Sequence, residues 1–332
     1  MRRNFWYITG LIPAILCIAG NLTGGWYSAA NFFYSLIVLG LLDVLLGEDN
    51  SNEVEENGLP ETWLIVHTVA HASSLITLFW GIHRGILSDQ FIIWASLSVG
   101  FQSGSSAVVV AHECIHKANP WYRNTGIWLL RSVGNVYFFV HHLRVHHRDV
   151  ATESDAVTAR KGEWIYAFIV RAIAQQHVQA WQQEQLRLRN RSILGKIWNN
   201  VQIQNYVWFL IVATGLYWMN PVFLMSWLWV VILAAVLLEY VNYIEHYGLK
   251  RKNDDPVGIE HSWNTQRIVS RFLLLDLPRH SHHHMHANLP YYKLESFEQE
   301  RKLPGGYASL IFPVFLPFWW FSLIHPKLLE NH

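Results

Sequence analysis

The sequence is poor in charged residues and in cysteine, and it has no excess of either charge. Asp, Glu, Lys and Arg make up only 15% of the 332 residues, against roughly 25% in an ordinary soluble domain. Hydrophobic residues make up 52%, which excludes a disordered chain and disfavours a soluble globule. With a formal net charge of +1, the chain has no basic excess to hold a nucleic acid.

The two cysteines, Cys17 and Cys114, are too few for a disulfide framework or a four-thiolate metal site. The sequence also lacks a glycine-rich dinucleotide motif, a haem motif and C-x-x-C pairs. We therefore expect no bound flavin or haem. Any redox metal must be held by other ligands.

Uncharged stretches long enough to cross a bilayer are abundant. Asn21 to Gly25 and Asn220-Pro221 divide the two longest of them. No A-x-A-type cleavage site follows the first stretch, so we expect it to be a retained span and not a signal peptide. The sequence thus predicts an all-α polytopic membrane protein, a single domain over residues 1–332, with about six spans, near 5–20, 29–46, 62–82, 90–111, 202–219 and 221–244.

The distribution of Lys and Arg predicts the topology. Arg2 and Arg3 precede the first span, and most other basic residues lie in segments 112–200 and 247–332. Because basic residues stay on the cytoplasmic side, we expect both termini and both segments to be cytoplasmic and to form a helical cap on the inner membrane of a bacterium. Within these segments, residues 175–191 are typical of a polar surface helix. Residues 303–326, which prolines interrupt, predict an interfacial or re-entrant element.

Histidine is the most unusual part of the composition. The chain has 19, and twelve of them gather in residues 112–147, at 246 and in residues 280–286. Residues 112–117 read HECIHK, residues 142–147 read HLRVHH and residues 280–284 read HSHHH. On a helix, the i, i+4 pairs His112/His116 and His142/His146 could each share one metal, as could His280 with His283 and His284. Clustered imidazoles beside membrane spans are costly to bury without a partner, and a metal is the usual partner.

These histidines are too many for one ion but suit two, and imidazole ligands without thiolate suit zinc, copper, iron or nickel. The motif His112-Glu113-x-x-His116 alone would also fit a zinc protease, with Glu113 as general base. A non-catalytic metal transporter is a third possibility, although it would place its ligands along the spans.

These blocks resemble those of the membrane-bound alkane 1-monooxygenase family of non-haem di-iron enzymes, within the wider histidine-rich group of membrane desaturases and hydroxylases. The resemblance runs from about residue 30 to residue 290. It also includes NYIEHYG at residues 242–248, which a desaturase would not be expected to carry. The resemblance implies nine iron-binding histidines, which here are His112, His116, His142, His146, His147, His246, His280, His283 and His284.

Three positions depart from the family pattern. His141 stands where the family usually has Glu, His282 stands where it has Asp, and Leu277-Pro278-Arg279 replaces Leu-Gln-Arg. Acids beside ligating imidazoles orient them, so the two histidines leave open whether they support ligands or become ligands.

The resemblance implies two Fe ions, O₂ as cosubstrate, and hydroxylation of the terminal carbon of medium-chain n-alkanes to 1-alcohols. Glu113 and Glu245 would hydrogen-bond to ligands or contact iron, and Asp149 and Asp155 could fix the second histidine block through Arg144 or Arg148. The alkane, which has no polar handle, should enter from the membrane lipid through an apolar tunnel. Electrons would come from a rubredoxin-type donor with an NAD(P)H-dependent reductase. An aromatic methyl group or a fatty acyl chain as substrate, or acyl desaturation, remains an alternative for the same site.

Overall fold

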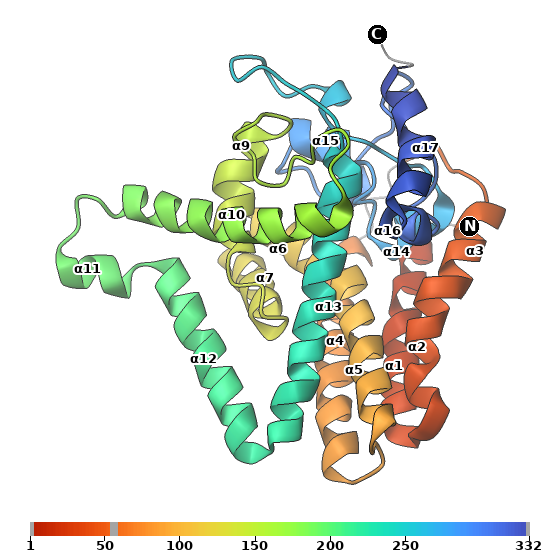
Figure 1. The fold of residues 1–332 in the computed structure, drawn as a ribbon, viewed down its shortest axis with the longest axis vertical. Coiled ribbons are helices and arrows are strands. Elements are labelled where there is room, and N and C mark those ends of the chain that lie inside the picture. The colour runs from red at the N-terminus through yellow and green to blue at the C-terminus, as the bar shows by residue number, and fades with distance from the viewer. Residues whose placement is uncertain (1–2, 54–58, 330–332) are drawn as a thin grey trace.

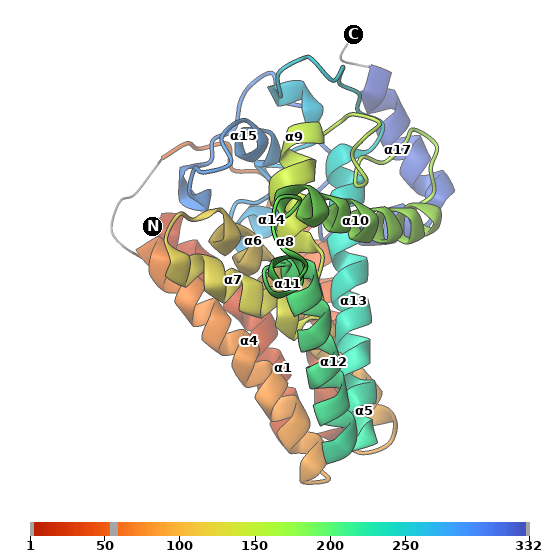
Figure 2. The same ribbon diagram turned by 90° about the vertical axis from the view of Figure 1, so that its left-hand side faces the viewer.

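The computed structural model describes residues 3–53 and 59–329, and within these ranges it contains helices, turns and loops but no strand. Long helices form a bundle, and short elements gather at one end of it, which we call the histidine end (Figures 1 and 2). Arg2, on which the topology prediction partly rests, lies outside the described residues. The side of the membrane on which the histidine end lies therefore stays a prediction.

Five helical segments are long and apolar enough to cross a membrane, and they agree with five of the six predicted spans. The first is Asn4–Thr23, which lies within η1 (Arg3–Leu11) and α1 (Ile12–Thr23). The second is Gly25–Leu45, which contains η2 (Gly25–Ala29), α2 (Ala30–Phe33), η3 (Tyr34–Val38) and α3 (Leu39–Leu45). The others are α4 (Leu59–His83), Gln90–His116 and α13 (Pro221–His246).

The predicted sixth span, 202–219, is a helix long enough to cross a membrane, but it is less apolar than the other five and is not counted with them. Helix α12 (Val201–Met219) runs antiparallel to α13 and reaches the same end of the bundle as the turn between α4 and α5 (Figure 1). Its first turns contain Gln202, Gln204 and Asn205. Asn205 accepts a hydrogen bond from Arg131 at 2.9 Å and donates one to the Val136 carbonyl at 2.8 Å. The polar start of α12 is thus hydrogen-bonded to the segment that contains Arg131 and Val136, and only the later turns of α12 are strongly apolar.

The helix that carries the first histidine pair does not stop at the predicted boundary of residue 111. α5 (Gln90–Gln102), the π-helical turn η4 (Ser103–Ala107) and α6 (Val108–His116) are continuous. His112 and His116 therefore lie on the last turns of a membrane-capable helix. That helix packs against α13, whose own last residue is His246.

The remaining elements belong to the histidine end or connect to it. Helix α10 crosses the bundle and contains most of the predicted surface helix 175–191 (Figure 1). The proline-containing segment near the C-terminus is split into α16 and the 13-residue α17, which is too short to span a bilayer. The elements are α7 (Pro120–Ser132), α8 (Phe138–His141), η5 (His142–His146), α9 (His147–Asp149), α10 (Ile165–Arg187), α11 (Ile193–Trp198), η6 (Ile259–His261), α14 (Ile268–Leu273), α15 (His280–Met285), η7 (Tyr291–Lys293), α16 (Ile311–Phe315) and α17 (Pro317–Leu329).

Candidate metal centre

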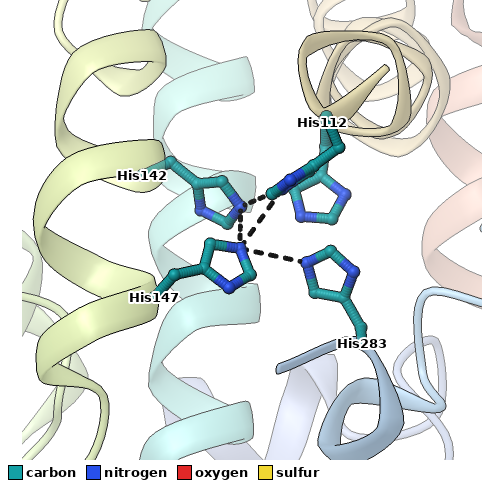
Figure 3. A group of neighbouring side chains, drawn as sticks. His112, His142, His147 and His283 are labelled. Atoms are coloured by element: carbon teal, nitrogen blue, oxygen red, sulfur yellow. Dashed lines mark hydrogen bonds between the residues drawn. The ribbon is translucent and has the colours of Figure 1, made fainter. Parts of the chain in front are cut away.

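The structure brings all nine histidines of the predicted ligand set together, in two groups. Within each group the candidate ligand atoms lie within 4.8 Å of one another. Four members of the first group point toward a common centre in Figure 3. The first group, which we call site A, is His112, His116, His142, His147 and His283, and the second, site B, is His146, His246, His280 and His284.

The grouping corrects the prediction that each sequence block serves one metal. His112 and His116 stay together, as do His280 and His284, whereas His146 is separated from His142, and His283 from His280 and His284. The cause in the second block is a π-helical turn, in which the amide of His147 donates to the carbonyl of His142, five residues back. This winding places His147 beside His142, with their Nε2 atoms 3.0 Å apart, and turns His146 toward site B.

The spacing of the nitrogens fits a metal ion at each site. In site A the Nε2 atom of His116 lies 3.0 Å from that of His142 and 3.2 Å from that of His147. In site B the Nε2 atom of His280 lies 2.9 Å from that of His284 and 3.2 Å from that of His246. Two nitrogens about 2.1 Å from one ion and at right angles to each other lie about 3 Å apart.

The chemistry of the donors also fits a cation. The buried Nε2 atom of His112 has no hydrogen-bond partner, although it belongs to site A. A neutral imidazole has one N–H, so several converging nitrogens cannot all be paired with one another. A bound cation would satisfy all of them at once.

Burial favours the neutral form of five of these imidazoles, those of His142, His147, His280, His283 and His284. It lowers the pKa of His142, His147 and His283 well below the usual range, and the charge that neighbouring imidazoles would carry lowers each pKa further. The pKa values of His280 and His284 fall for the same two reasons. Neutral imidazole is the form that binds metals.

Asp155 orients one ligand directly. Its carboxylate lies 3.0 Å from Nδ1 of His146, which leaves Nε2 of that ring for the metal. Burial opposes ionisation of Asp155, but its hydrogen bond with His146 and the neighbouring imidazoles hold the Asp155 pKa below its usual range. The predicted route through arginine is found for Asp149, which pairs with Arg148, but not for Asp155, and Arg144 pairs with Glu184 instead.

We expect the substitution Asp155→Asn to weaken metal binding at site B about 10- to 100-fold, because the amide cannot stabilise the ring of His146 as a carboxylate does. Competition with a chelator, followed by metal analysis, measures this change. The control is Asp149→Asn, which removes only the pairing with Arg148. Equal metal retention in the two variants would contradict the assignment of Asp155.

The two histidines that stand where the family usually has acids belong to neither site. His141 is 2.9 Å from the side-chain oxygen of Gln179, and Nδ1 of His282 accepts a hydrogen bond from the amide of Glu295 at 2.8 Å. Both rings are buried, and both stabilise segments that flank the ligands. The sequence left open whether these two histidines support ligands or become ligands. In the structure neither ring joins the converging nitrogens.

The two predicted glutamates differ in position. Glu113 forms an ion pair with Lys117 at 3.2 Å and belongs to neither group of candidate ligands. Glu245 places one carboxylate oxygen 3.1 Å from Nε2 of His280, and its other oxygen accepts a hydrogen bond from Tyr307 at 2.6 Å. Glu245 is therefore in reach of a metal at site B. Tyr307 carries no local sequence signal and was not predicted.

A buried charged network supports the helix that carries three of the histidines. Asp276, just before α15, is 2.7 Å from Nε of Arg271 and also accepts a hydrogen bond from Tyr7. Arg279 binds the carbonyl oxygens of Leu294 and Ser51 at 2.6 and 2.7 Å. These contacts connect α15 to three segments that are distant in the sequence.

An apolar cavity touches both sites. It is lined by Val108, Leu238 and other apolar side chains together with His112, His142, His146, His280 and Glu245. A second apolar cavity lies beside it and shares Gly104, Val109 and Val241 with it. At Gly104 a Cβ atom would lie 2.7 Å from the side chain of Leu237, so glycine is needed there for close packing.

The fold and the site define a class of protein, namely a helical membrane protein with two groups of histidines at one end. The fatty acid desaturase family model matches residues 90–312. Alkane 1-monooxygenase 1 of Pseudomonas aeruginosa is 33% identical, covering 86% of this chain and 79% of that protein. The alkane 1-monooxygenase of Pseudomonas putida is 34% identical, covering 99% and 86%. The chain belongs to the alkane 1-monooxygenase family, which confirms the resemblance found in the sequence.

A more distant relative is the xylene/toluene monooxygenase hydroxylase component XylM of Pseudomonas putida. It is 26% identical, covering 96% of this chain and 88% of that protein. The relatives of this chain are thus named for different substrates.

Proposed function

We propose that this protein is a membrane-bound monooxygenase that uses O₂ to convert medium-chain n-alkanes to 1-alcohols. The observation that carries the proposal is the convergence of nine histidines, seven of them buried and two partly buried, into two metal-sized groups beside an apolar cavity. The alkane 1-monooxygenases among its relatives support the substrate class.

The nine histidines would hold two iron ions, with Glu245 as an additional ligand or hydrogen-bond acceptor at site B. Iron supplies the O₂ and C–H chemistry that amino-acid side chains lack. Asp155 fixes the ring of His146, and Tyr307 fixes the carboxylate of Glu245. Both ligands are thereby held in orientation before the metal and substrate bind.

The apolar cavities would receive the alkane. Their walls come from α5, η4, α6, α13 and the segments after α14. This mostly apolar lining suits an alkane chain, and it includes only a few polar side chains such as Ser105 and Asn242. Entry between the spans would let the substrate come directly from the membrane lipid.

Each turnover takes two electrons and two protons, with the second oxygen atom of O₂ leaving as water. We propose that a rubredoxin-type protein, reduced by an NAD(P)H-dependent reductase, delivers the electrons to the histidine end. That end, with both chain termini, would face the cytoplasm across the inner membrane of a bacterium, as the basic segments 112–200 and 247–332 favour.

A second candidate is hydroxylation of an aromatic methyl group, which the relative named for xylene and toluene favours. Oxidation or desaturation of a fatty acyl chain is a further candidate, because the family model is that of fatty acid desaturases. All of these reactions would use the same residues.

The test is an assay of membranes that contain the iron-loaded protein, rubredoxin, the reductase and NADH, with octane, xylene and a fatty acid offered separately. We expect 1-octanol as the main product, and about two irons per chain with little zinc. Oxidation of xylene or the fatty acid alone would shift the assignment to that substrate. No oxidation of any of the three by iron-loaded protein would overturn the proposal.

A further inference from the structure

A buried acid on α13 lies outside both metal sites. Glu239 is fully buried, and its carboxylate accepts hydrogen bonds from three neutral donors. Gln176 donates at 2.7 Å, Asn242 at 3.1 Å and Tyr137 at 3.3 Å. A buried carboxyl group whose hydrogen-bond donors are all neutral is costly, and inside a membrane protein such a group commonly serves proton or ion movement.

The side chain of Gln176 suits both protonation states of this acid. Its NH₂ group donates to Oε1 of Glu239, while its own carbonyl oxygen is buried without a partner. If the amide turns over, that oxygen can accept a hydrogen bond from a protonated Glu239. The pocket around Glu239 can therefore stabilise the acid with or without its proton.

On its inner side, Glu239 lies directly behind the wall of the apolar cavity. Asn242, which binds the carboxylate, also lines that cavity together with His146, Glu245 and His280. Glu239, Asn242 and His246 follow one another along one face of α13. The rise of a helix places Glu239 and His246 about 10 Å apart along its axis.

On its outer side, a series of ring contacts and hydrogen bonds extends from Glu239 to the partly exposed surface. The ring of Tyr137 packs against that of His177 on α10, with 4.3 Å between the centroids. Nδ1 of His177 is 2.6 Å from the hydroxyl of Tyr206 on α12. His177 and Tyr206 are only partly buried, so water can reach this end of the series.

We propose that Glu239 relays protons from the surface at His177 and Tyr206 to the cavity beside the metal sites. The inference rests on the proposed function, in which each turnover consumes two protons and two electrons from the donor protein as one oxygen atom of O₂ becomes water. Glu239 does not touch the reacting atoms. It passes its proton through water in the cavity and takes up another by way of Tyr137 and His177.

The ionisable groups around Glu239 come from several elements. Tyr137 precedes α8, His177 lies on α10, and His146 in η5 is close enough to interact with Glu239 electrostatically. These groups would set how readily the acid releases its proton.

The test compares Glu239→Gln, which keeps the size and hydrogen bonds of the side chain but cannot carry a proton, with Glu239→Asp, which can. We expect the glutamine variant to keep its metal content and the KM for octane, to lose kcat about 10²-fold, and to show a larger solvent deuterium isotope effect. We expect the aspartate variant to recover part of kcat. A side chain with only a structural role would tolerate glutamine better than the shorter aspartate.

A second measurement does not depend on turnover. The infrared spectrum of the wild-type protein, with or without metal, should contain the carbonyl band of a protonated carboxylic acid that shifts in D₂O and is absent from the glutamine variant. The control is Glu184→Gln, because Glu184 is an equally buried acid that pairs with Arg144 and Arg187. We expect Glu184→Gln to leave the band and the isotope effect unchanged.

The proposal is overturned if Glu239→Gln turns over with the wild-type kcat and isotope effect, or if the wild-type spectrum lacks the band. A variant that fails to fold would leave the wild-type spectrum and the aspartate variant to decide. Failure of the wild-type protein to oxidise any of the three substrates would instead overturn the proposed function, and the spectrum would still report on Glu239.

Discussion

Replacement of His283 by alanine should lower the metal content of the purified protein from about two ions per chain to about one, and should reduce alkane oxidation at least about 10²-fold. His283 belongs to site A, with its Nε2 atom 3.2 Å from that of His147. Its loss leaves the other four nitrogens of site A without the ligand from α15. Metal analysis and the octane assay measure the two effects.

The matched control is His282→Ala, one residue earlier on the same helix. The ring of His282 faces the amide of Glu295 and lies outside both sites, so this variant should keep about two ions. A zinc protease built on His112, His116 and Glu113 would be indifferent to both substitutions. Equal metal content in the two variants would therefore contradict the two-site arrangement.

The substitution Asp276→Asn should cause the largest loss of stability. Asp276 is fully buried and is the carboxylate nearest to Nε of Arg271, which is also fully buried. Removing one member of a buried ion pair costs up to about 3–5 kcal/mol when the remaining charge stays buried without a partner. Asp49, 2.9 Å from Nη1 of Arg271, compensates part of that charge. We expect the apparent Tm to fall by about 10 °C and the metal to be lost more readily from α15.

A thermal unfolding curve followed by metal analysis tests this expectation. Asp149→Asn is the control, since the pair between Asp149 and Arg148 lies at the surface and such pairs contribute less than about 1 kcal/mol. If the Asp276→Asn variant has the same apparent Tm as the wild-type protein, the network around Arg271 does not stabilise α15.

The sequence predicted the helical class and five of the spans because long uncharged stretches are a strong local signal. It was weaker at α12. There, polar residues at the start of an apolar stretch looked compatible with a span, although Asn205 binds Arg131 and the Val136 carbonyl in the folded protein.

The candidate ligands were predicted residue by residue, but their distribution between the two sites was not. The spacing of His142 and His146 suggested a pair on one helical face, which is correct for an α-helix and wrong for the π-helical turn that forms there. Sequence spacing does not reveal such a turn. The supporting residues Tyr307 and Asp276 were also missed, because each acts across a long separation in the sequence.

The division of neighbouring histidines between the sites has a mechanical consequence. His146 and His147 are consecutive residues that serve different sites, and so are His283 and His284. Any shift of α15 or of the segment around η5 therefore moves a ligand of each site together. These two pairs of adjacent residues limit how far the two sites can move apart. The pair of sites should keep a nearly constant spacing while the surrounding helices adjust to the thickness of the bilayer.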